Sequence, residues 1–283
     1  MPNTLSTRSQ REKYLQSQYD VALRRRLVSR NIFSFDESNT KTIENPYGST
    51  ATATIQAIAG TYTVSTWTTT DDTLTVTDEV VVSEHIYRHD EVFSRFDIGA
   101  NRLDAMIFAV VDAIDKYAIN VITSEAGQVY TTPLGGFSQA NIGDIMANLI
   151  SLVQGYEEVS NGMFLVLEST DTVGFIQMGI NSGFNFADAV LNNGFFAQLM
   201  GVELYVTRPG LFVTATLGTK AVANANHRLF GIKGVATVAQ PGGITYDEKP
   251  VSGKTGREIE VSALVGAHAW ATKSSLLVDI TLA

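Results

Sequence analysis

The hydrophobic positions between residues 99 and 126 recur every three to four residues, which is the period of an α-helix. Gly127 follows this stretch directly, and no proline interrupts it. At 1.5 Å per residue such a helix extends for about 40 Å. We therefore predict one long helix that acts as a structural spine rather than as a catalytic platform. Its apolar stripe consists of Leu103, Met106, Ile107, Val110, Ile114, Tyr117, Ala118 and Val121.

A second helical pattern covers residues 8–30. Leu15, Tyr19, Leu23 and Leu27 follow one another at intervals of four residues, and no glycine or proline interrupts them. The pattern predicts an amphipathic helix with no core-forming segment directly after it. Such a helix is expected to be an arm that packs against a partner.

Period-two alternation marks the next part of the chain. Fourteen threonines lie between residues 40 and 77, and polar and apolar residues alternate in 50–58, 61–70 and 73–82. We predict strands there, with turns at Ala59–Gly60 and Asp71–Asp72. The apolar face is thin, and a long hairpin of this kind is marginal on its own. It is expected to lie against another chain, or alternatively to fold onto its own domain as an edge hairpin.

The remaining chain mixes both periods. Helices are predicted at 139–159 and 172–178, and a glycine-, asparagine- and phenylalanine-rich loop at 179–201. Residues 241–256 are predicted to form a loop. Together the patterns predict an α+β fold with a small α/β subdomain. The predicted strands are 163–167, 201–210, 235–240, 257–270 and 275–282.

Composition narrows the class of protein. The chain has 283 residues, a net charge of −9 and no cysteine, which excludes disulfides and thiol catalysis. The apolar run 105–111 is too short to cross a membrane, and no secretory signal is expected in the first 30 residues.

The charge is unevenly distributed along the chain. Residues 1–30 hold seven basic and two acidic residues, whereas the rest holds 13 basic and 27 acidic residues, a charge of −14. Such a body repels phosphate over a broad face. The cluster Arg24, Arg25 and Arg26 is expected to contact nucleic acid or an acidic neighbour, or to form a solvated helix face near a C-terminus.

Candidate chemistry is sparse. His85 and His89 have metal-binding spacing only on a helix, and the residues before them are strand-like, so a polar strand exit is the better interpretation. The sequence GKTG at 253–256 lacks the preceding glycine of a phosphate loop. Adjacent acids such as Asp71–Asp72 diverge on a regular element. Because no hydrolase, dinucleotide or metalloprotease motif occurs either, we predict no catalytic residue, no cofactor and no metal site.

The order of parts resembles the major capsid proteins of tailed phages, which share the Hong Kong 97-like fold with encapsulins. The segment GVELYVTRPG (201–210) is similar to the strand that leaves the family's axial (A) domain. HRLFGIKGVATVAQ (227–240) and GREIEVSALVGAHAWATKSSLLVDI (256–280) are similar to its closing peripheral (P) strands, with Gly266 before Ala267–His268.

The resemblance implies a domain division. Residues 1–34 would be the N-terminal arm, 35–83 the extended E-loop hairpin, 84–130 with 227–283 the P domain, and 131–226 the A domain. In the family the E-loop reaches over a neighbouring subunit. The residues implied to make this contact are Ile55, Ile58, Tyr62, Val64 and Trp67.

The resemblance also implies a function: a structural, non-enzymatic subunit that self-assembles as hexamers and pentamers into an icosahedral shell around phage dsDNA. Implied partners are separate scaffolding and portal proteins, a decoration protein, and packaged DNA bound non-specifically, with Arg24–Arg26 facing it. The protein would be made in the host cytoplasm and reside in the virion. Lys41 is the only lysine near the E-loop, and no cross-link is predicted.

Three alternatives stay open. The chain could form an encapsulin-type nanocompartment shell, or a small-ligand α+β enzyme with a pocket in loop 179–201. A tail-tube or adhesion module would suit the threonine content but would leave the long helix unexplained.

Overall fold

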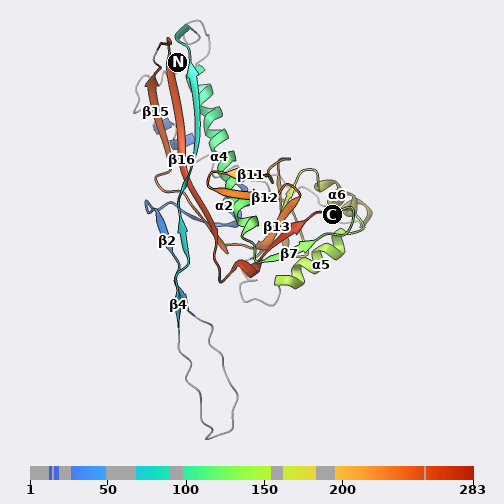
Figure 1. The fold of residues 1–283 in the computed structure, drawn as a ribbon. Helices are drawn as coiled ribbons and strands as arrows, with labels where there is room; N and C mark the ends of the chain where they lie inside the picture. Colours follow the sequence, from blue (N-terminus) through green and yellow to red (C-terminus); the bar gives the residue numbers. More distant parts are fainter. Residues whose placement is uncertain are drawn as a thin grey trace.

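The longest helix and the longest strand that the structure describes lie side by side (Figure 1). Helix α4 (Ile98–Ser124) packs along β16 (Arg257–Ala269) and its neighbour β6 (Asp78–Ile86). All eight residues of the predicted apolar stripe are buried, so the spine helix is confirmed. The computed structural model describes residues 13–14, 16–18, 27–48, 68–89, 98–153, 162–182, 195–251 and 253–283.

The first sheet is built around β16. One face of β6 and β16 packs on α4, whereas Glu79, Val81 and Leu264 on the opposite face are exposed. This alternation follows from the two-residue period of a strand. The sheet combines β1 (Ser34–Asp36), β14 (Ala236–Ala239), β16, β15 (Ile244–Pro250) and β6.

The second sheet has six strands, and it joins segments from the predicted A and P domains. The pairs β8–β10 and β7–β17 are parallel and the others antiparallel. Helix α5 (Ile142–Val153) packs against β13, and α6 (Thr172–Ser182) packs against α5. The chain therefore has the predicted α+β class. The strand order is β7 (Gln128–Thr131), β17 (Leu277–Thr281), β13 (His227–Ile232), β8 (Met163–Glu168), β10 (Val202–Thr207) and β9 (Phe195–Leu199).

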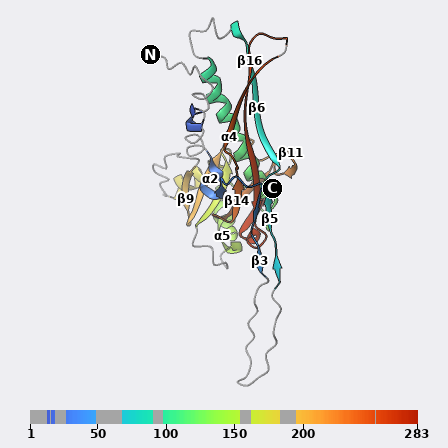
Figure 2. The same cartoon turned by 90° about the vertical axis from the view of Figure 1, so that its left-hand side faces the viewer.

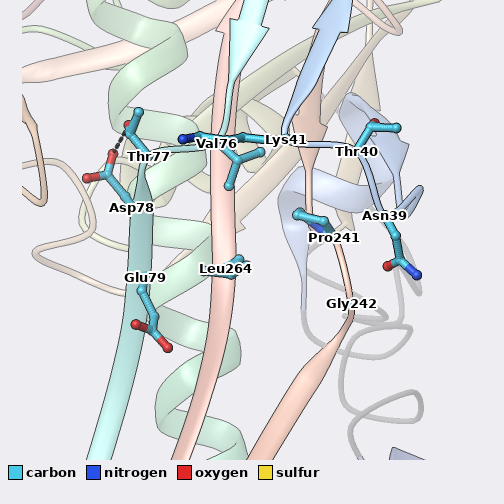
Figure 3. Close-up of a pocket in the computed structure, with 10 residues that line it drawn as sticks. All are labelled: Asn39, Thr40, Lys41, Val76, Thr77, Asp78, Glu79, Pro241, Gly242 and Leu264. Atoms are coloured by element: carbon cyan, nitrogen blue, oxygen red, sulfur yellow. Dashed lines mark hydrogen bonds between the residues drawn. The ribbon is translucent and has the colours of Figure 1, made fainter.

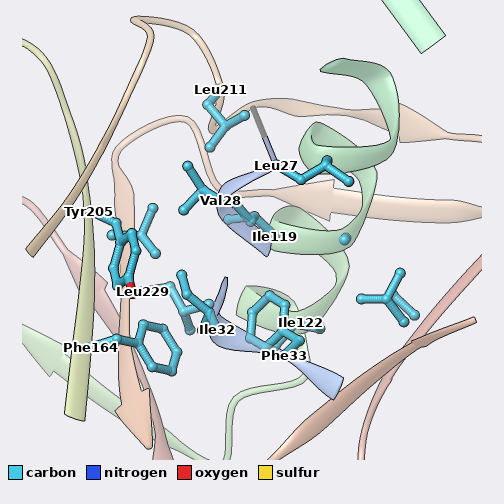
Figure 4. Packing of buried hydrophobic residues seen from close by; sticks show 14 of the residues in the cluster. Leu27, Val28, Ile32, Phe33, Ile119, Ile122, Phe164, Tyr205, Leu211 and Leu229 are labelled. Atoms are coloured by element: carbon cyan, nitrogen blue, oxygen red, sulfur yellow. The ribbon is translucent and has the colours of Figure 1, made fainter. Parts of the chain in front are cut away.

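The predicted continuous helix over 8–30 is wrong at its C-terminal end. Leu27 has an extended backbone (φ −74°, ψ 112°), and a separate helix, α2 (Val28–Ile32), begins after it. Burial explains the break, because Leu27, Val28 and Ile32 insert into the core of their own chain (Figure 4). The C-terminal end of the arm is therefore part of the hydrophobic core of its own chain.

A buried carboxylate holds the start of α2. The side chain of Asp115 accepts hydrogen bonds from the backbone N–H groups of Ser29 at 2.8 Å and Val28 at 3.4 Å. These are the donors that a helix N-terminus leaves unpaired. Burial raises the pKa of Asp115 to about 6, although these hydrogen bonds oppose the rise. Further towards the N-terminus, Tyr14 Oη donates to Asp104 of α4 at 3.2 Å.

Several strands lie in predicted loops or in segments that were left unassigned. Strand β15 lies inside the predicted loop 241–256, and Phe195 and Phe196 belong to β9 rather than to the loop 179–201. The β9–β10 turn uses Met200 and Gly201, both with positive φ, in place of the usual Asn-Gly. The hairpin of β11 (Thr214–Leu217) and β12 (Lys220–Ala223) was also not predicted.

Two short two-stranded ribbons follow one another end to end beyond the first sheet (Figure 1), and together we call them the stem. Their antiparallel register is the same throughout, since Thr42 pairs with Thr75 and Gly48 with Thr69. The predicted turn at Asp71–Asp72 is therefore wrong: these residues do not reverse the chain but lie opposite Asn45–Pro46, between the two ribbons. The stem consists of β2 (Thr42–Glu44), β3 (Tyr47–Gly48), β4 (Thr69–Thr70) and β5 (Thr73–Thr75).

Among the described residues, no helix is both long enough and apolar enough to cross a membrane.

The short 3₁₀ helix η2 (Ser274–Leu276) leads into β17. Gly127, predicted to end the spine helix, lies against η2: its N–H donates to the carbonyl oxygen of Ser274 at 2.8 Å, and a Cβ there would collide with the backbone of Ser274.

Candidate functional site at the base of the stem

The residues that the sequence places in contact with other molecules lie outside the described part of the chain. What the structure does describe is the base of the predicted hairpin that carries five of these eight residues, where the stem joins the body. The predicted contact residues outside the described ranges are Arg24, Arg25, Arg26, Ile55, Ile58, Tyr62, Val64 and Trp67.

Asp78 forms the first anchor of the stem. It begins β6 and is 5% exposed, and its carboxylate accepts hydrogen bonds from Tyr117 Oη at 2.6 Å and from Thr219 N at 2.6 Å and Oγ1 at 2.9 Å. Burial acts to raise the pKa of Asp78, yet these hydrogen bonds outweigh it and hold the pKa below its usual value. The carboxylate therefore ties the end of the stem to the spine helix and to the tip of β11–β12.

His268 forms the second anchor. Its ring lies between two carboxylates, with Nδ1 2.9 Å from Glu125 Oε2 and Nε2 2.8 Å from Asp72 Oδ1. Asp72 belongs to the stem, between β4 and β5, and Glu125 directly follows α4. The second oxygen of Asp72 also accepts the N–H of Ala271 at 2.6 Å. The stem is thus tied to the last residues of β16 and to the end of the spine.

The geometry favours the charged form of His268. An ionised carboxylate only accepts hydrogen bonds, so a ring that faces one at each nitrogen must carry a proton on both. The hydrogen bond to Glu125, followed by that to Asp72, holds the pKa of His268 above its usual value although burial opposes the rise. Burial acts to raise the pKa of Glu125, yet the hydrogen bonds from His268 and Ala269 hold it below its usual value.

The tip of the β11–β12 hairpin reaches both anchors. Thr219 donates to Asp78, and the next residue, Lys220, places Nζ 3.2 Å from Glu125 Oε1. Gly218 makes this approach possible, because its φ is +59° and a Cβ there would collide with the Asp78 carboxylate. One short hairpin therefore contacts both points that hold the stem.

A groove opens beside the first anchor, with a volume of about 530 Å³ (Figure 3). Val76, Pro241 and Leu264 supply apolar surface, and Lys41 and Glu79 supply charges of opposite sign. This combination of apolar and charged surface suits contact with another chain better than bond-breaking chemistry. Its lining is completed by Asn39, Thr40, Thr77, Asp78 and Gly242.

The other motifs considered in the sequence lie in ordinary strands and loops. His85 lies in β6, as expected for a polar strand exit, and its ring contacts Tyr87 edge-on at 4.4 Å. GKTG (253–256) connects β15 to β16, so it joins two strands rather than a strand and a helix. Within the described ranges, no group of three His, Asp or Glu side chains is arranged to hold a metal ion.

Comparison with solved structures finds capsids. The capsid of cyanophage P-SCSP1u aligns over 92% of this chain and 89% of its own, with a TM-score of 0.69 and 12% identity. A structure of Mycobacterium phage Che8 aligns over 90% and 91%, with a TM-score of 0.68 and 12% identity. The capsid of a native GTA particle aligns over 93% and 90%, with a TM-score of 0.64 and 20% identity. The chain has a phage capsid fold.

The matches to capsids come from comparing three-dimensional structures, not from comparing sequences. No protein-family model and no curated protein sequence matches the chain. The alignments nevertheless cover about nine-tenths of this chain and of each matched chain. They confirm the resemblance that the order of elements indicated, because they extend over nearly the whole length of both chains.

Proposed function

We propose that the chain is the major capsid protein of a tailed phage, a structural subunit that self-assembles as hexamers and pentamers into the icosahedral head shell around dsDNA. The observation that carries the proposal is the nearly full-length alignment with capsid chains. Because the alignment covers nearly all of both chains, it supports a shell-subunit role for the chain as a whole rather than for one part of it. We assign the chain the Hong Kong 97-like variant of the fold and no catalytic role.

The stem supports assembly. It extends away from the body as a two-stranded ribbon (Figure 2), and such a ribbon is marginal in water without a further surface to pack on. We infer that the segment it leads into lies on a neighbouring subunit. The residues proposed to make that contact are Ile55, Ile58, Tyr62, Val64 and Trp67.

The basic arm supports a role facing the packaged DNA. Residues 1–30 are positively charged on an otherwise acidic chain, which favours non-specific phosphate contact there. Replacing Arg24, Arg25 and Arg26 by glutamine should leave shells that retain less DNA at raised salt. DNA retention equal to that of the wild-type shell would remove the arm from this role.

The proposed partners follow from the same function. A separate scaffolding protein and a portal would be needed to build and fill a head, a decoration protein would bind outside, and the protein would reside in the virion after synthesis in the host cytoplasm. The phage head is favoured over an encapsulin-type shell because the similar structures described above are phage and GTA capsids.

Electron microscopy of the purified full chain tests the proposal. Closed icosahedral shells, or hexameric and pentameric capsomers, are the expected result, with a scaffolding protein added if the chain alone stays unassembled. A uniform small oligomer under both conditions would contradict a shell function. The small-ligand enzyme would then be the next candidate, tested through the segment 179–201.

A further inference from the structure

We propose that the tip of the β11–β12 hairpin and the His268 cluster form a two-point latch that sets the direction in which the stem leaves the body, and that the latch loosens when His268 loses its proton. The latch is a property of the single subunit. Only its consequence for shell building rests on the proposed function.

The two anchors bracket one strand of the stem. Asp72 and Asp78 lie on either side of β5 (Thr73–Thr75), and each carboxylate is held by groups on the body. A ribbon attached at a single point can pivot about that point, whereas two points fix its direction. The backbone adds only a few hydrogen bonds here, such as Val76 N to Lys41 O at 2.9 Å. The latch therefore shares the restraint with the small apolar cluster in which Leu74 and Val76 pack on Ala239 and Trp270.

His268 is the titrating member of this cluster. The charged groups that face it are Glu125 from the end of α4 and Asp72 from the stem, with Lys220 of β12 bound to Glu125. The Trp270 ring lies beside the imidazole, perpendicular to it, and carries no charge. A neutral imidazole keeps one N–H, so one of the two carboxylates would then face a nitrogen lone pair and be repelled.

Asp72 is the partner that moves away. Glu125 is held by Lys220 and by the N–H of Ala269 at 2.9 Å, and it belongs to the rigid end of the spine. Asp72 keeps the N–H of Ala271, but it lies in the stem, which is held by the small apolar cluster of Leu74, Val76, Ala239 and Trp270, whereas Glu125 follows a helix whose stripe lies in the main core. Loss of the proton should therefore free the stem while the body stays folded.

The direction of the pH effect follows from linkage. The pKa of His268 is higher in the folded chain than its usual value of 6.5. Its stabilising contribution is fully present below that usual value and is lost as the pH rises through the raised folded value. The stem should thus be most firmly held in mildly acidic solution and should loosen in alkaline solution.

Hydrogen exchange in free subunits tests the latch. The full chain is kept dilute, and the protection of peptides covering residues 69–77 is compared at about pH 6 and about pH 9, after correction for the intrinsic exchange rate. We expect protection in the wild type to fall roughly tenfold or more, as for loss of one charge-assisted hydrogen bond. Peptides from α4 and β8 should keep their protection at both pH values.

Three variants make the test specific. His268→Gln should show the weak, pH-independent protection from the start, and His268→Arg, a permanent cation with several N–H groups, should keep protection at about pH 9. His227→Gln is the matched control, because His227 makes a similar contact with Asp279, at 2.7 Å, but in the second sheet. It should behave as the wild type does at the stem.

The outcomes separate clearly. Stem protection that is equal at both pH values in the wild type, or that falls in His268→Arg as in the wild type, overturns the latch. If His268→Gln does not fold, Asp72→Asn gives the decision from the stem side and should lower protection at about pH 6. Because free subunits are used, a chain that shows the latch but builds no shell would contradict only the proposed function.

Discussion

The guanidinium of Arg228 lies between two carboxylates in the interior, and its side chain is 4% exposed. It donates to Asp171 and to Glu168, whose other oxygen accepts the N–H of Gly210 at 3.0 Å. The cluster fastens the loop after β10 to the end of β8. Burying three charges is costly, so the value of the cluster lies in the position it enforces, and removal of one member leaves the others uncompensated.

Replacement of Arg228 by methionine should therefore lower the free energy of unfolding by about 3–5 kcal/mol, measured by urea denaturation of free subunits. Lys249→Met is the matched control, because Lys249 also contacts two carboxylates, Asp247 and Glu260, but is exposed. It should leave the stability nearly unchanged, since exposed pairs are screened by solvent. Similar losses in both variants would show that burial is not what gives the Arg228 cluster its effect.

At the scale of elements, two helical glycines have opposite surroundings. A Cβ at Gly174 in α6 would collide with the carbonyl oxygen of Phe137, whereas a Cβ at Gly143 in α5 would meet nothing within 4 Å. The first glycine lets α6 approach the loop before α5. The second has no neighbour to accommodate and only weakens its helix.

The same substitution should thus change stability in opposite directions. Gly143→Ala should raise the free energy of unfolding by about 0.5–1 kcal/mol through helix propensity. Gly174→Ala should lower it by about 1–3 kcal/mol, because α6 must shift to relieve the collision. Urea denaturation of the two variants beside the wild type checks the signs, and a change of equal sign in both would contradict the packing described for α6.

Elements with a strong period were predictable from the sequence, and elements defined by partners were not. The apolar stripe of α4 and the apolar strand β8 can each be recognised from the local sequence alone. Strand β15 follows Gly242 and Gly243, and its apolar alternation is confined to Ile244 and Tyr246, so its pairing with β16 extends it through the polar residues that follow. Helix 8–30 was extended through Leu27 because nothing local indicates that this side chain enters the core.

The base of the stem was less predictable still. In the sequence, His268 is an isolated histidine, and Asp72 is one of the two residues of a predicted turn. The two are separated by most of the chain, and only the fold brings them to 2.8 Å. The alternation of residues 213–223 around Gly218 was a usable signal for β11–β12, but no local pattern indicates that its tip would hold both anchors.

At the scale of the whole molecule, variants of the proposed shell contact should affect assembly without affecting the folding of the subunit. Trp67→Ser combined with Ile58→Ser should leave the unfolding of free subunits unchanged, because these side chains are proposed to pack on a neighbour. Assembly should fail, since about 1–2 kcal/mol lost per contact is repeated at every subunit. Light scattering during assembly measures this, with Thr69→Ser in the stem as the control. Normal shells from the double variant would contradict the contact.

The topology of the first sheet has a consequence for how the chain acquires its structure. Ser34 pairs with Thr237, and Val82 with Val261, so the sheet cannot close until segments far apart in the chain have met. Pairings of such separation make folding slow. Until β16 arrives, β1 and β6 leave backbone edges open to the wrong neighbours. The kinetic competitor of correct folding is therefore aggregation during synthesis, and conditions that slow collisions between nascent chains should improve the yield of native subunits.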